Sequence, residues 1–339
     1  MTFNPVAIYA LCTILPVTAT LAVLARMKVR VLRKATLKTD DWTAVAGLVV
    51  LWCIAVIVIV GAVQGLFGAH TLQDPQTGAT IITQLDRRNI EYMWIVVVIS
   101  ILSIGLVKLS VVLLYRRIFA ISRAFNIYTS GLLALVTAWA IAFLAANLFQ
   151  CGIHPESAWT NVKMIEKYCY DTSPATSACL LTNLIVDLMI LGAPIGIIWR
   201  LHMSLARKLQ VTGIFALGLF SVAAGAARAY ILLTDTYGPD EGFFDLRDSN
   251  TDVVMWTLIE IVAALVGCCL PRLRPLLVDT SLGRSLSSLL STFSLRSNKS
   301  RLSFKEEDDE ELAIITIGGA RSKGRANMLQ GTESNCSAV

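Results

Sequence analysis

Long apolar runs alternate with short polar segments along most of the chain. A helix that crosses a bilayer core about 30 Å thick needs roughly 20 mostly apolar residues, so we searched for runs of that length. Seven are found, at about residues 5–25, 42–63, 92–114, 126–149, 176–199, 209–234 and 253–270. The pattern predicts an all-α fold, a polytopic membrane bundle of seven transmembrane helices.

Composition supports a membrane protein over a soluble one. The 339 residues are 55% hydrophobic and only 16% charged, and the mean hydropathy is +0.65. This is more apolar surface than a soluble globule of the same length can bury. The expected surroundings are therefore a lipid bilayer.

Basic residues concentrate after the first, third and fifth apolar runs. They are Arg26, Lys28, Arg30, Arg33, Lys34 and Lys38, then Arg116, Arg117 and Arg123, then Arg200, Arg207 and Lys208. The alternate segments hold only Arg87, Arg88, Lys163, Lys167 and Arg247. Because cytoplasmic loops are enriched in Lys and Arg, this asymmetry predicts an N-terminus outside and a C-terminus in the cytoplasm, with the plasma membrane as the expected location.

The same distribution bears on partners and processing. The net charge of +5 is spread along one membrane face, which argues against a nucleic-acid partner. No basic residue precedes the first apolar run and a basic cluster follows it. That order is typical of a retained signal anchor and not of a cleaved signal peptide.

The last part of the chain, residues 279–339, differs from the seven-helix domain predicted for residues 1–278. Apolar residues recur at helical spacing opposite a Ser-rich face, which favours an eighth helix along the inner leaflet; a Ser-rich linker is the open alternative. These residues are Leu282, Leu286, Leu289, Leu290 and Phe293. The acidic run at 306–311 lies in polar sequence that cannot bury a core, and it predicts a disordered tail.

Two cysteines fall in the predicted outer segment between the fourth and fifth runs, Cys151 and Cys169. An oxidising environment lets a disulfide persist there, so we expect these two residues to be bridged. Cysteine spacing indicates no metal site, and the chain has only three histidines. We therefore expect neither a metal nor another cofactor.

Four ionisable residues interrupt the apolar runs: Lys108, Asp187, Arg228 and Glu260. Each costs about 2.5 to 3.5 kcal/mol at the centre of a bilayer, so each should face the bundle interior beside a partner. At a rise of about 1.5 Å per residue, Arg228 and Glu260 lie at similar depths on consecutive helices. We expect them to pair, and we expect Lys108 to reach Asp187 through its long aliphatic stem.

Asn183 and Asp187 are four residues apart and so share one face of the fifth helix, with Pro194 placed to kink that helix further along. This face looks like the wall of a polar cavity. Two interpretations stay open. The buried charges fix the helix register and bind nothing, or they line a ligand pocket and relay a conformational change.

Several motifs together resemble the fungal seven-transmembrane rhodopsin-domain family, receptor-like integral membrane proteins of filamentous fungi. They are Asp40-Asp41-Trp42, the run KLSVVLLYRRIF at 108–119, FQC at 149–151, NLIVDLMILGAPIGIIWRL at 183–201, Arg228, and Glu260 before LPRLRPLL at 270–277. The resemblance covers about residues 1–278 and leaves out the tail. It implies the architecture of a G-protein-coupled receptor. It also implies that some relatives are encoded beside secondary-metabolite gene clusters.

The resemblance does not imply bound retinal. A light-sensing rhodopsin carries its Schiff-base lysine on helix seven, whereas the seventh run here holds Glu260 and no lysine. Lys108 lies on the third run instead.

Four functional hypotheses remain. The first is a receptor-like protein in which an extracellular or membrane-dissolved small molecule shifts the later helices and a cytoplasmic signalling partner responds. The second is a membrane-embedded enzyme, such as a cyclase, that uses Asp187 or Glu260 as an acid. The third, a transporter, is disfavoured because no inverted repeat is visible. The fourth is an accessory protein of a fungal secondary-metabolite pathway.

Overall fold

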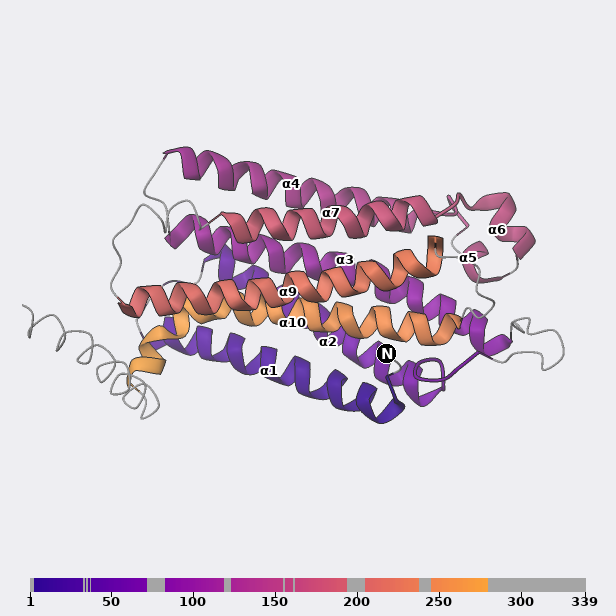
Figure 1. Ribbon diagram of the computed structural model, residues 1–339, viewed down its shortest axis with the longest axis horizontal. Coiled ribbons are helices and arrows are strands. Elements are labelled where there is room, and N and C mark those ends of the chain that lie inside the picture. The colour runs from indigo at the N-terminus through magenta and orange to yellow at the C-terminus, as the bar shows by residue number, and fades with distance from the viewer. Residues whose placement is uncertain are drawn as a thin grey trace, which may run out of the picture. The chain divides into compact units, whose positions relative to one another are not determined.

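The computed structural model describes residues 3–32, 34, 36, 38–71, 83–118, 123–154, 156–160, 162–193, 205–237 and 245–279. In these residues seven helices are long and apolar enough to cross a membrane, as predicted. They are α1 (Pro5–Leu32), α2 (Thr39–Val63), α3 (Gln84–Ile118), α4 (Arg123–Leu148), α7 (Ser173–Gly192), α9 (Leu205–Tyr237) and α10 (Leu246–Asp279). Two short helices, α5 (Ser157–Thr160) and α6 (Val162–Tyr168), come between α4 and α7 in the chain and lie at one end of the long helices (Figure 1).

Several helices are longer than their apolar runs. Helix α1 continues seven residues past Ala25, α3 begins at Gln84, and α10 begins at Leu246. Arg26 and Arg247, which the sequence placed in loops, are therefore buried helix residues. The apolar pattern stops at the first charge, but a helix continues wherever that charge finds a partner inside the bundle.

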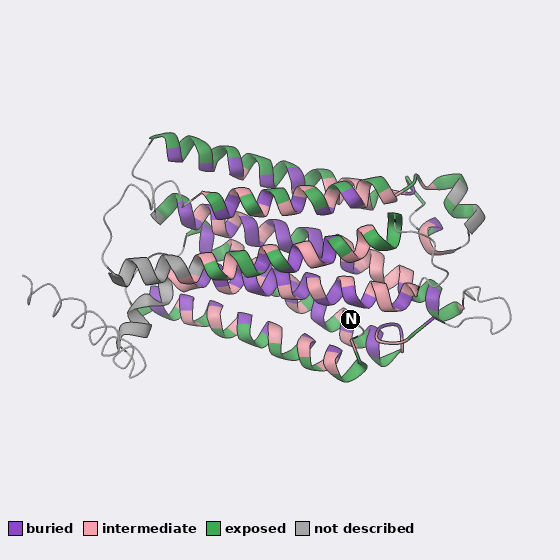
Figure 2. Ribbon diagram, viewed as in Figure 1, coloured by how far each residue is buried: buried purple, intermediate pink, exposed green. Residues whose placement is uncertain are grey.

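Helix α10 lies at the centre of the bundle, and α4 lies at its edge (Figure 2). In the most apolar stretch of each helix, 72% of α10 residues are buried but only 17% of α4 residues. Met255, Leu258 and Leu265 of α10 are fully enclosed. Side chains on α10 therefore meet residues from most of the other helices.

Apolar side chains also cover the outward faces of the helices. Ile14, Leu21, Val49 and Ile141 are each more than half exposed. A soluble protein rarely exposes contiguous apolar surface of this kind, whereas hydrocarbon accommodates it. The chain is a multi-pass membrane protein with lipid around the bundle.

The end of α2 folds back into the bundle. Gly65 has a φ of 74°, which a residue with a side chain rarely adopts. The Gly65 and Leu66 amides donate to the carbonyls of Ala62 and Gly61, the paired bonds of a Schellman motif. Leu66 and Phe67 are consequently turned inward and are fully buried.

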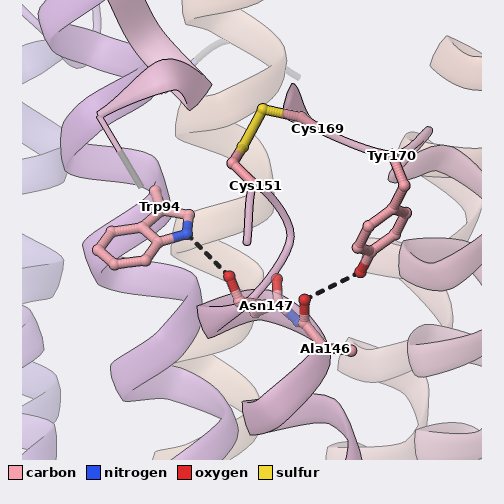
Figure 3. Close-up of a disulfide and its surroundings, with 6 residues drawn as sticks. All are labelled: Trp94, Ala146, Asn147, Cys151, Cys169 and Tyr170. Carbon is pink, nitrogen blue, oxygen red and sulfur yellow. Dashed lines mark hydrogen bonds between the residues drawn. A yellow bond between two sulfur atoms is a disulfide. The ribbon is translucent and has the colours of Figure 1, made fainter. Parts of the chain in front are cut away.

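A disulfide joins Cys151 and Cys169, as predicted (Figure 3). It ties the end of α4 to the segment that leads into α7. Gly152, with a φ of 61°, lets the chain turn directly after Cys151. Tyr170 Oη donates to the Ala146 carbonyl at 2.9 Å, and Trp94 Nε1 of α3 donates to the Asn147 carbonyl at 3.1 Å. We call this end of the bundle the disulfide end.

Three predictions concern residues beyond those described. The kink expected at Pro194, the eighth helix proposed at Leu282–Phe293 and the acidic tail lie outside the described residues. The division of the chain into domains 1–278 and 279–339 stays a prediction.

Candidate functional site

Two buried ion pairs cross the interior of the bundle. Arg228 Nη2 of α9 lies 3.0 Å from Glu260 Oε2 of α10, and Lys108 Nζ of α3 lies 2.8 Å from Asp187 Oδ1 of α7. Only 3% to 12% of the surface of each of these four side chains is exposed. The partners are those expected from depth along the helices.

Asn183 of α7 joins the two pairs. Its Nδ2 donates to Glu260 Oε1 at 2.8 Å, and its backbone carbonyl accepts from Lys108 Nζ at 2.9 Å. The five residues predicted as a polar network therefore form one connected group from four helices: Lys108, Asn183, Asp187, Arg228 and Glu260. We call this group the charged layer. Whether it binds a ligand stays a prediction.

Small and aromatic neighbours complete the layer. A Cβ atom added at Gly225 would stand 3.5 Å from the Glu260 carboxyl carbon, an ordinary van der Waals distance, so this part of α9 passes beside that carboxylate. Thr257 Oγ1 accepts from Arg228 Nη1 at 3.2 Å. The Lys108 ammonium lies 5.6 Å from the centre of the Trp139 ring, within the range of a cation–π interaction. Arg228, Glu260 and Lys108 thus each have more than one contact, whereas the Asp187 carboxylate is held by Lys108.

A cavity lies on each side of the charged layer. The first, of about 100 Å³, is on the side of the disulfide end. Its wall comprises Met93, Val96, Val97, Ser100, Ile101, Ile104, Trp139, Asn147, Thr176, Cys179, Leu180, Arg228, Leu232, Val253, Val254 and Thr257. We call it the disulfide-end cavity. Arg228 and Trp139 are its links to the charged layer.

The second cavity, of about 50 Å³, lies on the other side of the layer. Its wall comprises Lys108, Val111, Tyr115, Asp187, Ile190, Leu191, Gly218, Ser221, Ala263, Ala264, Gly267 and Cys268. Drug-sized ligands usually occupy about 300 to 1,000 Å³. Each cavity as it stands therefore fits a small molecule or one end of a larger one.

A second charged cluster, which the sequence analysis did not identify as a site, lies at the end opposite the disulfide. Arg26 of α1 is fully buried and pairs with Asp41 and Asp40 of α2, at 2.9 Å each. Its Nη1 also donates to the Cys268 carbonyl of α10 at 2.9 Å. Arg30 lies 2.6 Å from Asp41. We call this group the Arg26 cluster.

The sequence does contain a signal for the Arg26 cluster. Arg26 and Arg30 are four residues apart on one face of α1, and adjacent aspartates open α2 after a short loop. The apolar pattern alone predicts these arginines only as cationic loop residues. The cluster fixes α1, α2 and α10 together, and Arg117 at the end of α3 reaches Asp40 at 3.6 Å.

With the geometry established, comparison with known proteins identifies the family. The sequence profile of the fungal rhodopsin domain matches residues 25–279. The chain belongs to the fungal rhodopsin domain family. The match includes the charged layer and both cavities, but only residues 25–32 of α1. No solved structure matches the chain.

Curated relatives of this fungal rhodopsin-domain protein come from filamentous fungi. It is 32% identical to a SAT4 family membrane protein of Emericella nidulans over 49% of this chain and 40% of that protein. It is 27% identical to the satratoxin biosynthesis SC1 cluster protein 4 of Stachybotrys chartarum, over 65% of this chain and 76% of that protein. The polyenoic acids biosynthesis gene cluster protein Ba17b of Metarhizium anisopliae is 26% identical over 76% and 70% respectively. The chain thus spans less than half of the first of these relatives.

At the disulfide end of the fungal rhodopsin-domain protein, polar contacts fasten the start of α10 to the first turn of α3 and to the segment after α2. Arg247 Nε lies 2.7 Å from Asp86 Oδ1. Asp245, just before α10, accepts from the Thr71 hydroxyl at 2.7 Å and the Thr71 amide at 3.0 Å, and its Oδ2 lies 2.7 Å from His70 Nδ1. Partial burial raises the pKa of Asp245, but the hydrogen bonds from Thr71 and His70 outweigh it and lower that pKa below its usual value.

Proposed function

We propose that this chain is a receptor-like membrane protein that senses an extracellular or membrane-dissolved small molecule in the disulfide-end cavity. One observation carries the proposal: the wall of this cavity includes Arg228, which is itself held by Glu260 at 3.0 Å. A molecule that touches Arg228 acts on the charged layer, which links α3, α7, α9 and α10. Binding would thereby change the relative stability of two arrangements of these helices.

The second step of the proposal connects the charged layer to the opposite end. Lys108 and Asp187 line the smaller cavity together with Cys268. The carbonyl of Cys268 accepts from Arg26, which holds the start of α2. The charged layer and the Arg26 cluster are therefore connected through the wall of one cavity, and we place the contact with a cytoplasmic partner at the Arg26 cluster.

The orientation that goes with this function is an N-terminus outside and a C-terminus in the cytoplasm, in the plasma membrane. Two observations support it: the positive-inside bias of the loops, and the disulfide, which persists where the environment is oxidising. Accessibility of epitope tags in intact cells tests it. We expect an N-terminal tag to be reached from outside and a C-terminal tag only after permeabilisation; both tags on one side would refute the orientation.

The relatives' names favour a second candidate, an accessory protein of a secondary-metabolite pathway. Two relatives are named as proteins of satratoxin and polyenoic acid biosynthesis clusters. The enzyme alternative has less support from the geometry. Glu260 is absent from the described walls of both cavities, and Asp187 faces a cavity of about 50 Å³ with Lys108 at 2.8 Å.

A deletion strain of the host fungus, complemented with variants, separates the candidates. Val254→Phe fills the disulfide-end cavity, whose wall includes Val254. Val56→Phe adds the same bulk at a position that is 52% exposed, on the lipid side, and serves as the control. The readouts are untargeted metabolite profiles and the transcriptional response to an extract of the culture medium.

A receptor predicts that the transcriptional response fails with Val254→Phe and survives with Val56→Phe. An accessory protein predicts a lost metabolite while the response to the extract stays intact. A wild-type response from the deletion strain itself would reject the sensing function.

A further inference from the structure

The disulfide-end cavity is almost entirely apolar. Valine, isoleucine, leucine and methionine side chains from α3, α7, α9 and α10 make up most of its wall, and Trp139 closes it on the α4 side. An apolar cavity of about 150 Å³ in another protein holds a benzene ring. At about 100 Å³, this cavity fits the branched or cyclic end of a lipid-soluble molecule.

Two buried polar groups in the wall of the disulfide-end cavity lack hydrogen-bond partners among the described residues. They are the Ser100 hydroxyl of α3 and Arg228 Nε of α9. Over the whole residue, 5% of the surface of Ser100 and 6% of the surface of Arg228 are exposed. Other buried serines in the bundle do reach an acceptor: the Ser177 hydroxyl donates to the Ser173 carbonyl at 2.8 Å, and the Ser103 hydroxyl donates to the Gly47 carbonyl at 3.4 Å. Ser100 is an exception, and an unpaired buried donor is costly until an acceptor reaches it.

Charge balance in the adjoining layer restricts what that acceptor is. Arg228 is paired with Glu260 and Lys108 with Asp187, so the two cations of the charged layer are matched by two carboxylates. A carboxylate ligand would add an unmatched buried anion. A protonated amine would add an unmatched cation beside Arg228. Either ion loses its hydration on entry, a penalty of several kcal/mol that no free counter-charge among the described residues of the cavity wall offsets.

We propose that the disulfide-end cavity binds an uncharged, lipid-soluble carbonyl compound, such as an ester, lactone or ketone. This inference rests on the proposed function and specifies its ligand class. A carbonyl oxygen has two acceptor sites and no donor, which matches the two unpaired donors, Ser100 and Arg228. The apolar remainder of the molecule packs against the valine and isoleucine wall or extends between helices into lipid.

Photoaffinity labelling of the full-length protein in lipid nanodiscs tests the ligand class. Four diazirine probes share one medium-chain alkyl skeleton and end in a methyl ester, a carboxylate, a primary ammonium or a plain hydrocarbon. Labelled positions are mapped by mass spectrometry at neutral pH. We expect the methyl ester to label residues of the cavity wall, such as Met93 and Cys179, several-fold more than the other three probes.

Ser100→Ala removes one unpaired donor while changing little volume. We expect it to reduce ester labelling about 2- to 10-fold, the range for one hydrogen bond. Ser103→Ala is the matched control, because Ser103 lies on the same helix, is fully buried, and bonds to the Gly47 carbonyl instead. It should leave ester labelling unchanged.

The outcomes separate this inference from the proposed function. Stronger labelling by the carboxylate, the ammonium or the hydrocarbon would overturn the ligand class, as would a Ser100→Ala variant that labels like wild type. In those cases Val254→Phe should still abolish the transcriptional response, and sensing would stand. If no probe labels the cavity wall and Val254→Phe also responds normally, both proposals fail.

Discussion

Arg228 of α9 and Glu260 of α10 approach to 3.0 Å at the centre of the bundle, with side chains that are 7% and 3% exposed. Glu260 also accepts from Asn183 of α7, at 2.8 Å. Three helices therefore meet at one carboxylate. Removing a single partner leaves a buried charge without compensation, which costs far more than the pair contributes.

The first prediction is strong coupling between these two residues. Glu260→Gln and Arg228→Gln should each destabilise the bundle by about 3 to 5 kcal/mol, because each leaves an unmatched charge. The double variant should lose less than the sum, with an interaction energy of about 0.5 to 3 kcal/mol. The measurement is the free energy of unfolding of wild type, both single variants and the double variant, with the purified protein in detergent and tryptophan fluorescence as the signal.

The control for this cycle pairs Glu260→Gln with Arg26→Gln, because Arg26 bonds to Asp40, Asp41 and Cys268, and none of these bonds involves Glu260. Those two effects should add. Additive effects for Glu260 and Arg228, together with lost product formation by a folded Glu260→Gln variant, would point to catalysis instead.

The ion pairs of the charged layer could be predicted because hydrocarbon makes isolated charges costly and helical rise fixes their depth. Lys108 and Asp187 met as expected, and so did Arg228 and Glu260. The Arg26 cluster was not predicted, because the cost of an isolated charge in hydrocarbon was assumed to end the helix at the first arginine. Charges end the first apolar run, which predicts Arg26 and Arg30 as loop cations, although Asp40 and Asp41 are close enough in sequence to neutralise them.

The cavities could not be predicted from sequence at all. Whether Val96, Val254 and Leu180 fill the space next to Ser100 depends on how five helices cross. The hydropathy pattern does not determine the distances and angles between helices. The unpaired state of Ser100 follows only from that packing. Polar residues within apolar runs thus predicted which residues form the charged layer, but the shape of the adjoining cavities follows only from the structure.

The second prediction concerns Arg26. Its planar guanidinium donates simultaneously to Asp40, Asp41 and the Cys268 carbonyl, which a lysine ammonium cannot match in geometry. Arg26→Gln should cost about 3 to 5 kcal/mol of stability, and Arg26→Lys a smaller but measurable share of that loss. Thermal unfolding in detergent is the measurement.

Lys28→Gln, two residues away on the exposed face of α1, is the matched control and should leave the melting temperature nearly unchanged. If Arg26→Lys melts like wild type, then the fork geometry of Arg26 is not what holds α1 to α2.

The third prediction concerns the disulfide. Cys151 and Cys169 are 18 residues apart, and closing a loop of that size stabilises a fold by about 3 kcal/mol in the chain-entropy treatment. Cys151→Ser should lower the melting temperature and loosen the segment that carries α5 and α6. Cys53→Ser, at a free and exposed cysteine, is the control and should melt like wild type. Equal melting temperatures with and without reductant in wild type would show that the bond contributes nothing.

The last prediction uses pH to probe the contact between α10 and the segment after α2. Hydrogen bonds from Thr71 and His70 hold the pKa of Asp245 below its usual value, despite the opposing effect of burial. A carboxyl with a lower pKa in the folded state binds fewer protons than in the unfolded state. Its stabilising contribution is therefore present above the unfolded value of about 3.9, and it is lost as the pH falls through the folded pKa.

Wild type and Asp245→Asn are compared by thermal unfolding between about pH 2 and pH 6, a range that extends from above the unfolded pKa of about 3.9 to well below it. Wild type should melt higher above about pH 5, and the difference should shrink toward zero as the pH falls. Thr71→Val removes the hydroxyl donor at 2.7 Å but keeps the backbone amide at 3.0 Å. It should reduce the pH-dependent difference without abolishing it. A gap between wild type and Asp245→Asn that stays constant across this range would mean that the ionised carboxylate does not fasten this end of α10.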